Sequence, residues 1–158
     1  MELNKKTVKE SQVTMIELVL PNDTNIHKTL LGGRLMHWMD IATAMAASKH
    51  CNKIAVTAAV DKLTFNIPIH LGNIVTLKAS VNRAFNTSME VGVKVESEDI
   101  ETGEISHSNS AYFTFVAIDR ETGKKVKVPP VIPETDEEKR RFEQALSRRN
   151  ERISLNKR

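Results

Sequence analysis

One carboxylate stands in the most apolar segment of the chain. Asp40 is the only acidic residue in the stretch 31–48, which holds no proline and four alanines after a Gly-Gly pair, a composition that predicts a helix. An unpaired buried carboxylate is costly, so proteins usually pair it or use it. Such a group can deprotonate a water or attack an electrophile directly. The plain structural alternative, more common for a lone Asp within a helix, is a solvated strip or a pairing with His37, one turn earlier.

The predicted helix is apolar around most of its circumference. At about 100° per residue, its apolar side chains occupy both broad faces, which predicts a helix buried nearly all round against a sheet. These side chains are Leu35, Met36, Trp38, Met39, Ala42, Met45 and Ala46. The amides around Gly32 and Gly33 open the helix without acceptors inside it, so they are natural donors to an oxyanion. A tight helix entry with positive φ is an equally good and compatible interpretation of the Gly pair.

Strands surround this helix in the chain order. Val, Ile and Thr content and alternation of apolar with polar residues predict strands on both sides of it, and a polar, aromatic-poor segment predicts a final helix. The expected strands are 10–20, 54–65, 75–81, 89–96 and 105–118, the turn clusters include 21–25, and the final helix is 136–149. One long helix followed by consecutive strands predicts an α+β domain in which the helix lies on one antiparallel sheet.

Composition excludes several classes of protein. The 158 residues suit one domain, which we place at 1–133, with a basic C-terminal helix or tail at 134–158. There is no apolar run near the ~20 residues needed to span a bilayer, and no signal peptide is recognisable, so no membrane insertion is expected. A single cysteine, Cys51, favours the cytoplasm. Neither a metal-ligand spacing nor a Gly-x-Ser-x-Gly elbow occurs, so no metal and no serine triad are predicted.

The C-terminal segment is strongly basic. From Lys139 onward, eight Lys and Arg residues accompany only two acidic ones. Because aromatic residues make up only 4% of the chain, platforms for base stacking are scarce and no nucleic-acid partner is expected. A solvated helix is the common explanation of such charge, and contact with a phosphate-bearing small ligand is the functional one.

Four stretches in one order carry a family resemblance. They are Asp23-Thr24-Asn25, Leu31-Gly32-Gly33 through Trp38-Met39-Asp40, Val56-Thr57-Ala58, and Val81-Asn82-Arg83-Ala84-Phe85-Asn86-Thr87-Ser88-Met89-Glu90-Val91. Over about residues 15–118 the chain resembles the hotdog-fold acyl-CoA thioesterase family. The resemblance implies hydrolysis of fatty acyl-CoA to free fatty acid and coenzyme A, with coenzyme A as part of the substrate and no separate cofactor.

The resemblance also implies site residues. Asp40 would be the general base or nucleophile, Asn25 its polar partner and Thr57 a supporting hydroxyl, with the amides of Gly32 and Gly33 at the oxyanion. Some relatives place the Asn nearer the Gly pair, where this chain has Thr29. The residues expected to bind coenzyme A are Ala58, Ala59, Val60, Arg83, Thr87, Ser88, Met89, Arg148 and Arg149. For the two tail arginines a solvated helix is at least as common, and Met36, Met39 and Met45 are either an acyl tunnel or core packing.

The family pairs two such domains into a continuous sheet. We therefore expect a homodimer with active sites at the interface, assembled as a trimer of dimers. The rival hypothesis is a non-catalytic acyl-CoA-binding regulatory protein on the same fold. A third is a hotdog dehydratase that would use His27 or His37 with its carboxylate. Acyl chain length, nucleotide regulation and the choice between water activation and an anhydride are left open by the sequence.

Overall fold

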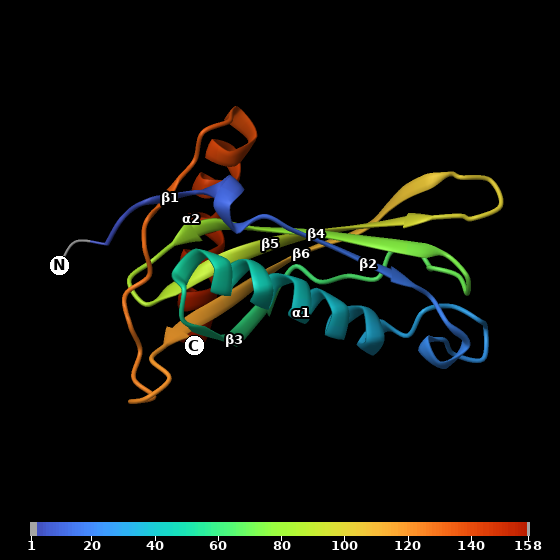
Figure 1. The fold of residues 1–158 in the computed structure, drawn as a ribbon, viewed down its shortest axis with the longest axis horizontal. Helices are drawn as coiled ribbons and strands as arrows, with labels where there is room; N and C mark the ends of the chain where they lie inside the picture. The colour runs from blue at the N-terminus through green and yellow to red at the C-terminus, as the bar shows by residue number, and fades with distance from the viewer. Residues whose placement is uncertain (1–2, 158) are drawn as a thin grey trace.

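A long helix lies along one face of a five-stranded antiparallel sheet, in a computed structural model that describes residues 3–157 (Figure 1). The helix is α1, Gly32–Cys51, and the sheet has the order β2-β4-β5-β6-β3. The strands are β2 Val13–Leu18, β3 Ile54–Asp61, β4 Ile74–Ala84, β5 Ser88–Glu98 and β6 Ile105–Ile118. A second helix, α2, Asp136–Asn156, lies on the face of the sheet away from α1. This is the predicted α+β hotdog architecture.

The N-terminal strand is shorter than predicted. A 3₁₀ turn, η1, occupies Val8–Ser11, so β2 begins only at Val13. Before it, β1, Lys6–Thr7, pairs in parallel with β7, Val131–Ile132. Two-residue strands carry no periodicity, which is why neither was expected from the sequence. A second 3₁₀ turn, η2, fills Pro21–Asp23 in the predicted turn cluster.

Alternation along the strands builds the core between α1 and the sheet. In β4, the residues Val75, Leu77, Ala79 and Val81 are buried against α1, while their neighbours face outward. Residues of β5 and β6, including Val91, Phe113 and Phe115, complete this layer. The outer face is more polar, and it is the face that α2 partly covers.

The helix α1 is buried on one side only. Leu35, Trp38 and Met39 pack into the core, whereas Met36 and Met45 on the opposite side are each about 40% exposed. The prediction that α1 is buried nearly all round is therefore wrong for one chain, because the five-stranded sheet covers only one side of the helix. The helix ends where Asn52 adopts a left-handed conformation, which Asn tolerates better than most residues.

A β-bulge interrupts β3 between Thr57 and Ala59. Thr57 stands opposite Phe115 and Ala59 opposite Thr114, so Ala58 has no partner in the ladder and the side-chain alternation shifts by one residue. Strict alternation from residue 54 predicts Val60 on the same side as Val56, and this alternation fails beyond the bulge. The strand also ends at Asp61, four residues before the predicted end, because Lys62 turns the chain with a positive φ of 59°.

The C-terminal helix starts as the sequence predicts and runs seven residues further. Thr135 caps α2 by accepting a hydrogen bond from the amide of Glu138 at 3.1 Å, in a capping box. Ala145, on the side of α2 that faces the sheet, is fully buried, which shows that α2 packs against the sheet. The boundary placed at 133/134 falls in the connection just before it. Within residues 3–157, no helix is long and apolar enough to cross a membrane.

Candidate active site

Asp40 and Thr57 meet where α1 crosses β3. The hydroxyl Oγ1 of Thr57 donates a hydrogen bond to Oδ1 of Asp40 at 2.6 Å, a short, charge-assisted contact. Thr57 lies just before the bulge of β3, on the side of the strand that faces α1. Asp40 is half-buried. Among residues 3–157 its carboxylate accepts a hydrogen bond from Thr57, and the alternative pairing with His37 is not formed.

Asn25 is engaged within its own loop. Its Oδ1 accepts hydrogen bonds from the amides of His27 at 2.9 Å and Thr29 at 3.2 Å, and its Nδ2 donates to Thr29 Oγ1 at 2.9 Å. This is an Asx-type turn, which the residue type favours. The loop precedes the start of α1, and Asp40 lies roughly 10 Å further along the axis from Gly33. Among residues 3–157, the side-chain hydrogen bonds of Asn25 stay within this loop and none reaches Asp40.

Gly32 and Gly33 begin the first turn of α1, and neither has a positive φ angle. The positive-φ interpretation of the pair is therefore wrong. Gly32 is needed for close approach instead, since a Cβ there would lie 3.3 Å from the ring of Phe65, whereas a Cβ on Gly33 would meet nothing within 4 Å. The intrahelical donors begin with Arg34 and Leu35, which both reach Leu31 O, so the Gly amides are left for an external acceptor.

A cavity of about 350 Å³ opens beside this helix start. Its walls come from the first turn of α1, from the segment 65–69 and from β6. Apolar side chains such as Leu35, Ile67 and Ile69 dominate the lining, and Asn109 is the polar group contributed by β6. An apolar cavity next to free amides suits a ligand with an apolar group attached to a carbonyl.

The residues expected to bind coenzyme A fall into two groups. Ala58, Ala59 and Val60 lie on β3, an edge strand of the sheet whose outer backbone groups can pair with an extended arm. Thr87, just before β5, and Ser88, its first residue, are both half-buried. Met89 is fully buried in a central strand, so it presents neither side chain nor backbone to a ligand.

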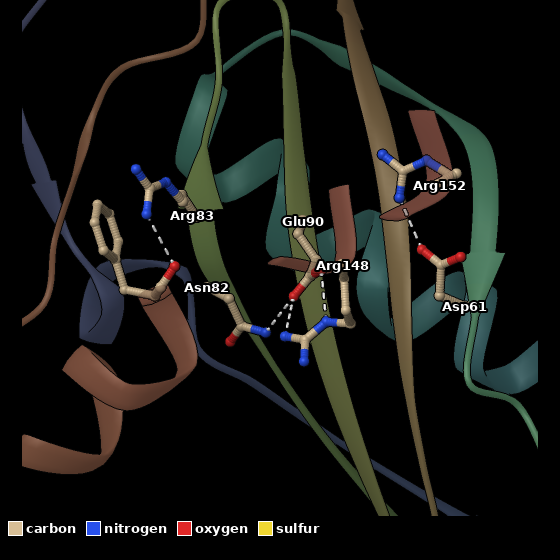
Figure 2. A network of polar contacts seen from close by, with 7 residues as sticks. Asp61, Asn82, Arg83, Glu90, Arg148 and Arg152 are labelled. Carbon is tan, nitrogen blue, oxygen red and sulfur yellow. Dashed lines mark hydrogen bonds and ion pairs between the residues drawn. The ribbon is translucent and has the colours of Figure 1, made fainter. Parts of the chain in front are cut away.

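Of the three arginines expected to bind coenzyme A, Arg83 and Arg148 contact other parts of the protein (Figure 2). Arg83 donates to Phe142 O at 3.1 Å and stacks on the Phe142 ring, with its guanidinium 4.0 Å from the ring centre. Arg148 makes a bidentate pair with the buried carboxylate of Glu90, at 3.0 and 2.7 Å, and stacks 3.6 Å from the centre of Tyr112. These contacts hold α2 on the sheet.

The guanidinium of Arg149 lies close to the segment Thr87–Met89, which is predicted to bind coenzyme A. Its guanidinium lies 4.7 Å from the centre of the Phe85 ring, two residues before Thr87. Lys5 and Lys127 line a cavity of about 620 Å³ that Phe85 also borders. We therefore correct the expectation for Arg148, whose guanidinium is committed to Glu90, and keep Arg149 as the phosphate candidate from α2.

The structure also places the methionines of α1 and the two histidines considered as site residues. Met39 is fully buried core packing, while Met36 and Met45 face outward from α1. His27 and His37 are both exposed, and the carboxylate of Asp40 is bonded to Thr57 instead of either. Among residues 3–157, no three His, Cys, Asp or Glu side chains converge as a metal site would require.

Sequence reasoning missed three features of the site: the Phe65 ring over Gly32, the buried Asn109 and the Glu90 partner of Arg148. Glu90 carried no signal, because it lies on the polar side of the alternation in β5, as Lys94 and Glu96 do. Asn109 carries no signal by itself, because a lone Asn is usually a turn residue.

Comparison with known proteins places the chain among thioesterases. A model of the Thioesterase superfamily matches residues 27–104. The uncharacterized acyl-CoA thioester hydrolase YkhA of Bacillus subtilis is 43% identical over 144 residues, which cover 91% of this chain and 83% of that protein. An apo-hexameric acyl-CoA thioesterase superposes with a TM-score of 0.93 at 37% identity, over 98% of each chain. The chain therefore belongs to the hotdog-fold acyl-CoA thioesterase family, as its sequence resemblance implied.

A hydrolase from Staphylococcus aureus is similar over nearly the whole chain. Its structure in complex with butyryl coenzyme A, coenzyme A and coenzyme A disulfide gives a TM-score of 0.89 at 38% identity, covering 96% of this chain and 92% of that one. Further structures of that enzyme replace an asparagine, an aspartate and a threonine by alanine. In sequence, those three residues are separated by 15 and then 17 positions, as Asn25, Asp40 and Thr57 are here.

Proposed function

We propose that this protein hydrolyses fatty acyl-CoA thioesters, with Asp40 as the general base or nucleophile. The observation that carries the proposal is the 2.6 Å hydrogen bond from Thr57 to the only carboxylate of α1. Thr57 engages Oδ1 and so sets the plane of the carboxylate, leaving Oδ2 to act on water or on the thioester carbonyl. The matching separations in the S. aureus enzyme support the choice of Asn25, Asp40 and Thr57.

The chemistry needs few groups because the leaving group is good. A thiol with a pKa near ~8.5 departs as thiolate without a dedicated acid. The negative charge that develops on the carbonyl oxygen needs donors, and the amides of Gly32 and Gly33 supply them at the positive end of α1. The open space at Gly33 permits the close approach that such donors require.

We further propose that the complete site forms between two copies of the chain. Asn25 and the Gly amides lie at the start of α1, whereas Asp40 lies about two turns further along the helix, bonded to Thr57 of β3. This separation is the reason to propose that a second copy brings the groups to one carbonyl. Two features can accept a second copy. The edge strand β3 has residues 54–57 outside the segment assigned to the coenzyme, and the outward side of α1 exposes Met36, Ile41 and Met45. The hexameric relative supports an assembly built from such pairs.

The coenzyme would lie along β3 and the start of β5. In this proposal the edge of β3 at Ala58–Val60 pairs with the extended arm, and Thr87 and Ser88 contact it by hydroxyl groups. Arg149 reaches the phosphates from α2, next to Phe85, with Arg83 on the neighbouring strand. Each guanidinium is able to make charge-assisted bonds to phosphate oxygens.

The test is Asp40→Asn, which keeps the shape of the side chain. We expect kcat on acyl-CoA to fall at least about 100-fold, because the group that activates water or attacks is removed. The fold should be retained, since a neutral isostere in place of a half-buried carboxylate is tolerated well. Thiol release from acyl-CoA measures turnover, and coenzyme A binding by calorimetry serves as the control for an intact site. Near-native turnover would remove Asp40 from the mechanism and favour the non-catalytic acyl-CoA-binding alternative.

A further inference from the structure

The cavity at the start of α1 contains one polar group that its surroundings do not satisfy. Asn109 is 4% exposed and lies on the α1 side of β6, in register with the buried Val95. Its Nδ2 donates to the backbone carbonyl of Thr64, which fixes the orientation of the amide. Its Oδ1 is fully buried, and no group in residues 3–157 donates a hydrogen bond to it.

A buried acceptor without a donor is unusual. The great majority of buried side-chain polar atoms are hydrogen-bonded, because leaving one unpaired sacrifices its interaction with water. A water molecule is a poor substitute here, because it would need two to four polar partners. The other polar side chain at the cavity, Thr29, is already bonded to Asn25 through its hydroxyl, and the remaining side chains are apolar.

The position of the cavity relates it to the proposed chemistry. Gly32 forms part of its wall, and the Phe65 ring that covers Gly32 forms another part. A carbonyl oxygen bound by the first amides of α1 would therefore have its acyl chain at the cavity mouth. At the roughly 30 Å³ that a water occupies in the liquid, 350 Å³ accommodates roughly a dozen heavy atoms, enough for a short acyl group.

We propose that this cavity binds the acyl group of the substrate, and that Asn109 Oδ1 accepts a hydrogen bond from a hydroxyl carried by that group. The inference rests on the proposed function and adds a substrate class to it, short hydroxyacyl thioesters. Asn109 is then a specificity-determining residue. A site that hydrogen-bonds a substrate hydroxyl discriminates against the analogue without it more strongly than an apolar pocket discriminates by size.

The test compares kcat/KM for butyryl-CoA with the values for 3-hydroxybutyryl-CoA and 4-hydroxybutyryl-CoA. For the wild type we expect at least one hydroxylated substrate to be preferred about 10-fold, because it alone satisfies the buried acceptor. In Asn109→Leu, which replaces the amide by an apolar group of similar shape, the preference should fall to about 1. Ser110→Ala, on the exposed side of the same strand, should keep the wild-type preference.

The wild-type ratios test the proposal even if Asn109→Leu does not fold, and Asn109→Ala then provides the second variant. Equal or better use of butyryl-CoA by the wild type would overturn the assignment, as would a hydroxyl preference that survives in the folded variants. Both results would leave hydrolysis of butyryl-CoA in place. Failure of the proposed function is distinguishable, because the wild type would then release no thiol from any of the three substrates.

Discussion

At the scale of single residues, the site depends on how Asp40 is held. A carboxylate on a helix can adopt several rotamers, and only some present an oxygen to a substrate. The hydroxyl of Thr57, 2.6 Å from Oδ1, restricts that choice from a different element of the fold. Thr57 is thus expected to act on the rate through Asp40, as a positioning residue.

Thr57→Val tests this role, because valine keeps the branched shape and removes the hydroxyl. We expect kcat to fall about 10-fold, in keeping with the loss of one orienting hydrogen bond of about 1.4 kcal/mol, while KM changes little. Thr57→Ser restores a hydroxyl and should recover most of the rate. Steady-state kinetics on a single acyl-CoA measures both parameters. Equal rates for the Val and Ser variants would show that the hydroxyl is not used.

At the scale of elements, α2 is held on the sheet by buried charge. The side chains of Arg148 and Glu90 are only 11% and 4% exposed, and Asn82 also donates to Glu90 at 3.0 Å (Figure 2). Towards the end of the helix, Arg152 pairs with Asp61 of β3 at 2.8 Å. These contacts fix the register of α2 and so place Arg149 beside Phe85. Part of the basic charge of α2 is therefore used in ion pairs that pack the helix on the sheet, and is not available to a ligand.

Arg148→Met is expected to destabilise the protein by about 3 kcal/mol. The substitution leaves Glu90 buried without its cation, and an unpaired buried charge is strongly unfavourable. Arg140→Met is the matched control on the same helix, since Arg140 is exposed and pairs only with Glu137, and it should cost less than about 0.5 kcal/mol. Urea unfolding followed by circular dichroism gives both values. Comparable effects of the two substitutions would contradict the role assigned to Arg148.

At the scale of the whole molecule, we propose that one chain carries two separate parts of the site. Asn25 and the Gly amides belong to one end of α1, and Asp40 with Thr57 belongs to its middle. A two-fold pair of chains that places the loop of one copy against the helix of the other would create two equal sites. The exposed apolar side of α1 and the free edge of β3 are consistent with such a pair.

Mixing two inactive variants tests the shared site. Asn25→Ala and Asp40→Ala should each be nearly inactive alone. Refolded together in equal amounts, they should form hybrid dimers in about half of cases, each with one intact and one doubly altered site, so activity should recover to roughly a quarter of wild type. Native mass spectrometry establishes that hybrids have formed. Confirmed hybrids without recovered activity would place both residues in a site within a single chain.

The sequence alone determined the elements and the central carboxylate. Apolar periodicity and the absence of proline located α1 to within a few residues, and alternation located β4, β5 and β6. These are local properties, because each residue's preference depends on its neighbours along the chain. The lone carboxylate of α1 stood out for the same reason, as the one acidic residue in an apolar helix.

Only the tertiary structure decided which of these residues meet. The bulge in β3, the bond from Thr57 to Asp40 and the pairing of Arg148 with Glu90 all join residues 17 or more positions apart. The burial of the unsatisfied oxygen of Asn109 likewise depends on residues distant in the sequence, such as Thr64. Each depends on strand register and on the docking of α1 and α2, and no local pattern encodes either. Arg148 and Arg149 illustrate the difference: adjacent and chemically identical in sequence, they are separated by the helix geometry into a buried structural cation and a half-buried one beside Phe85.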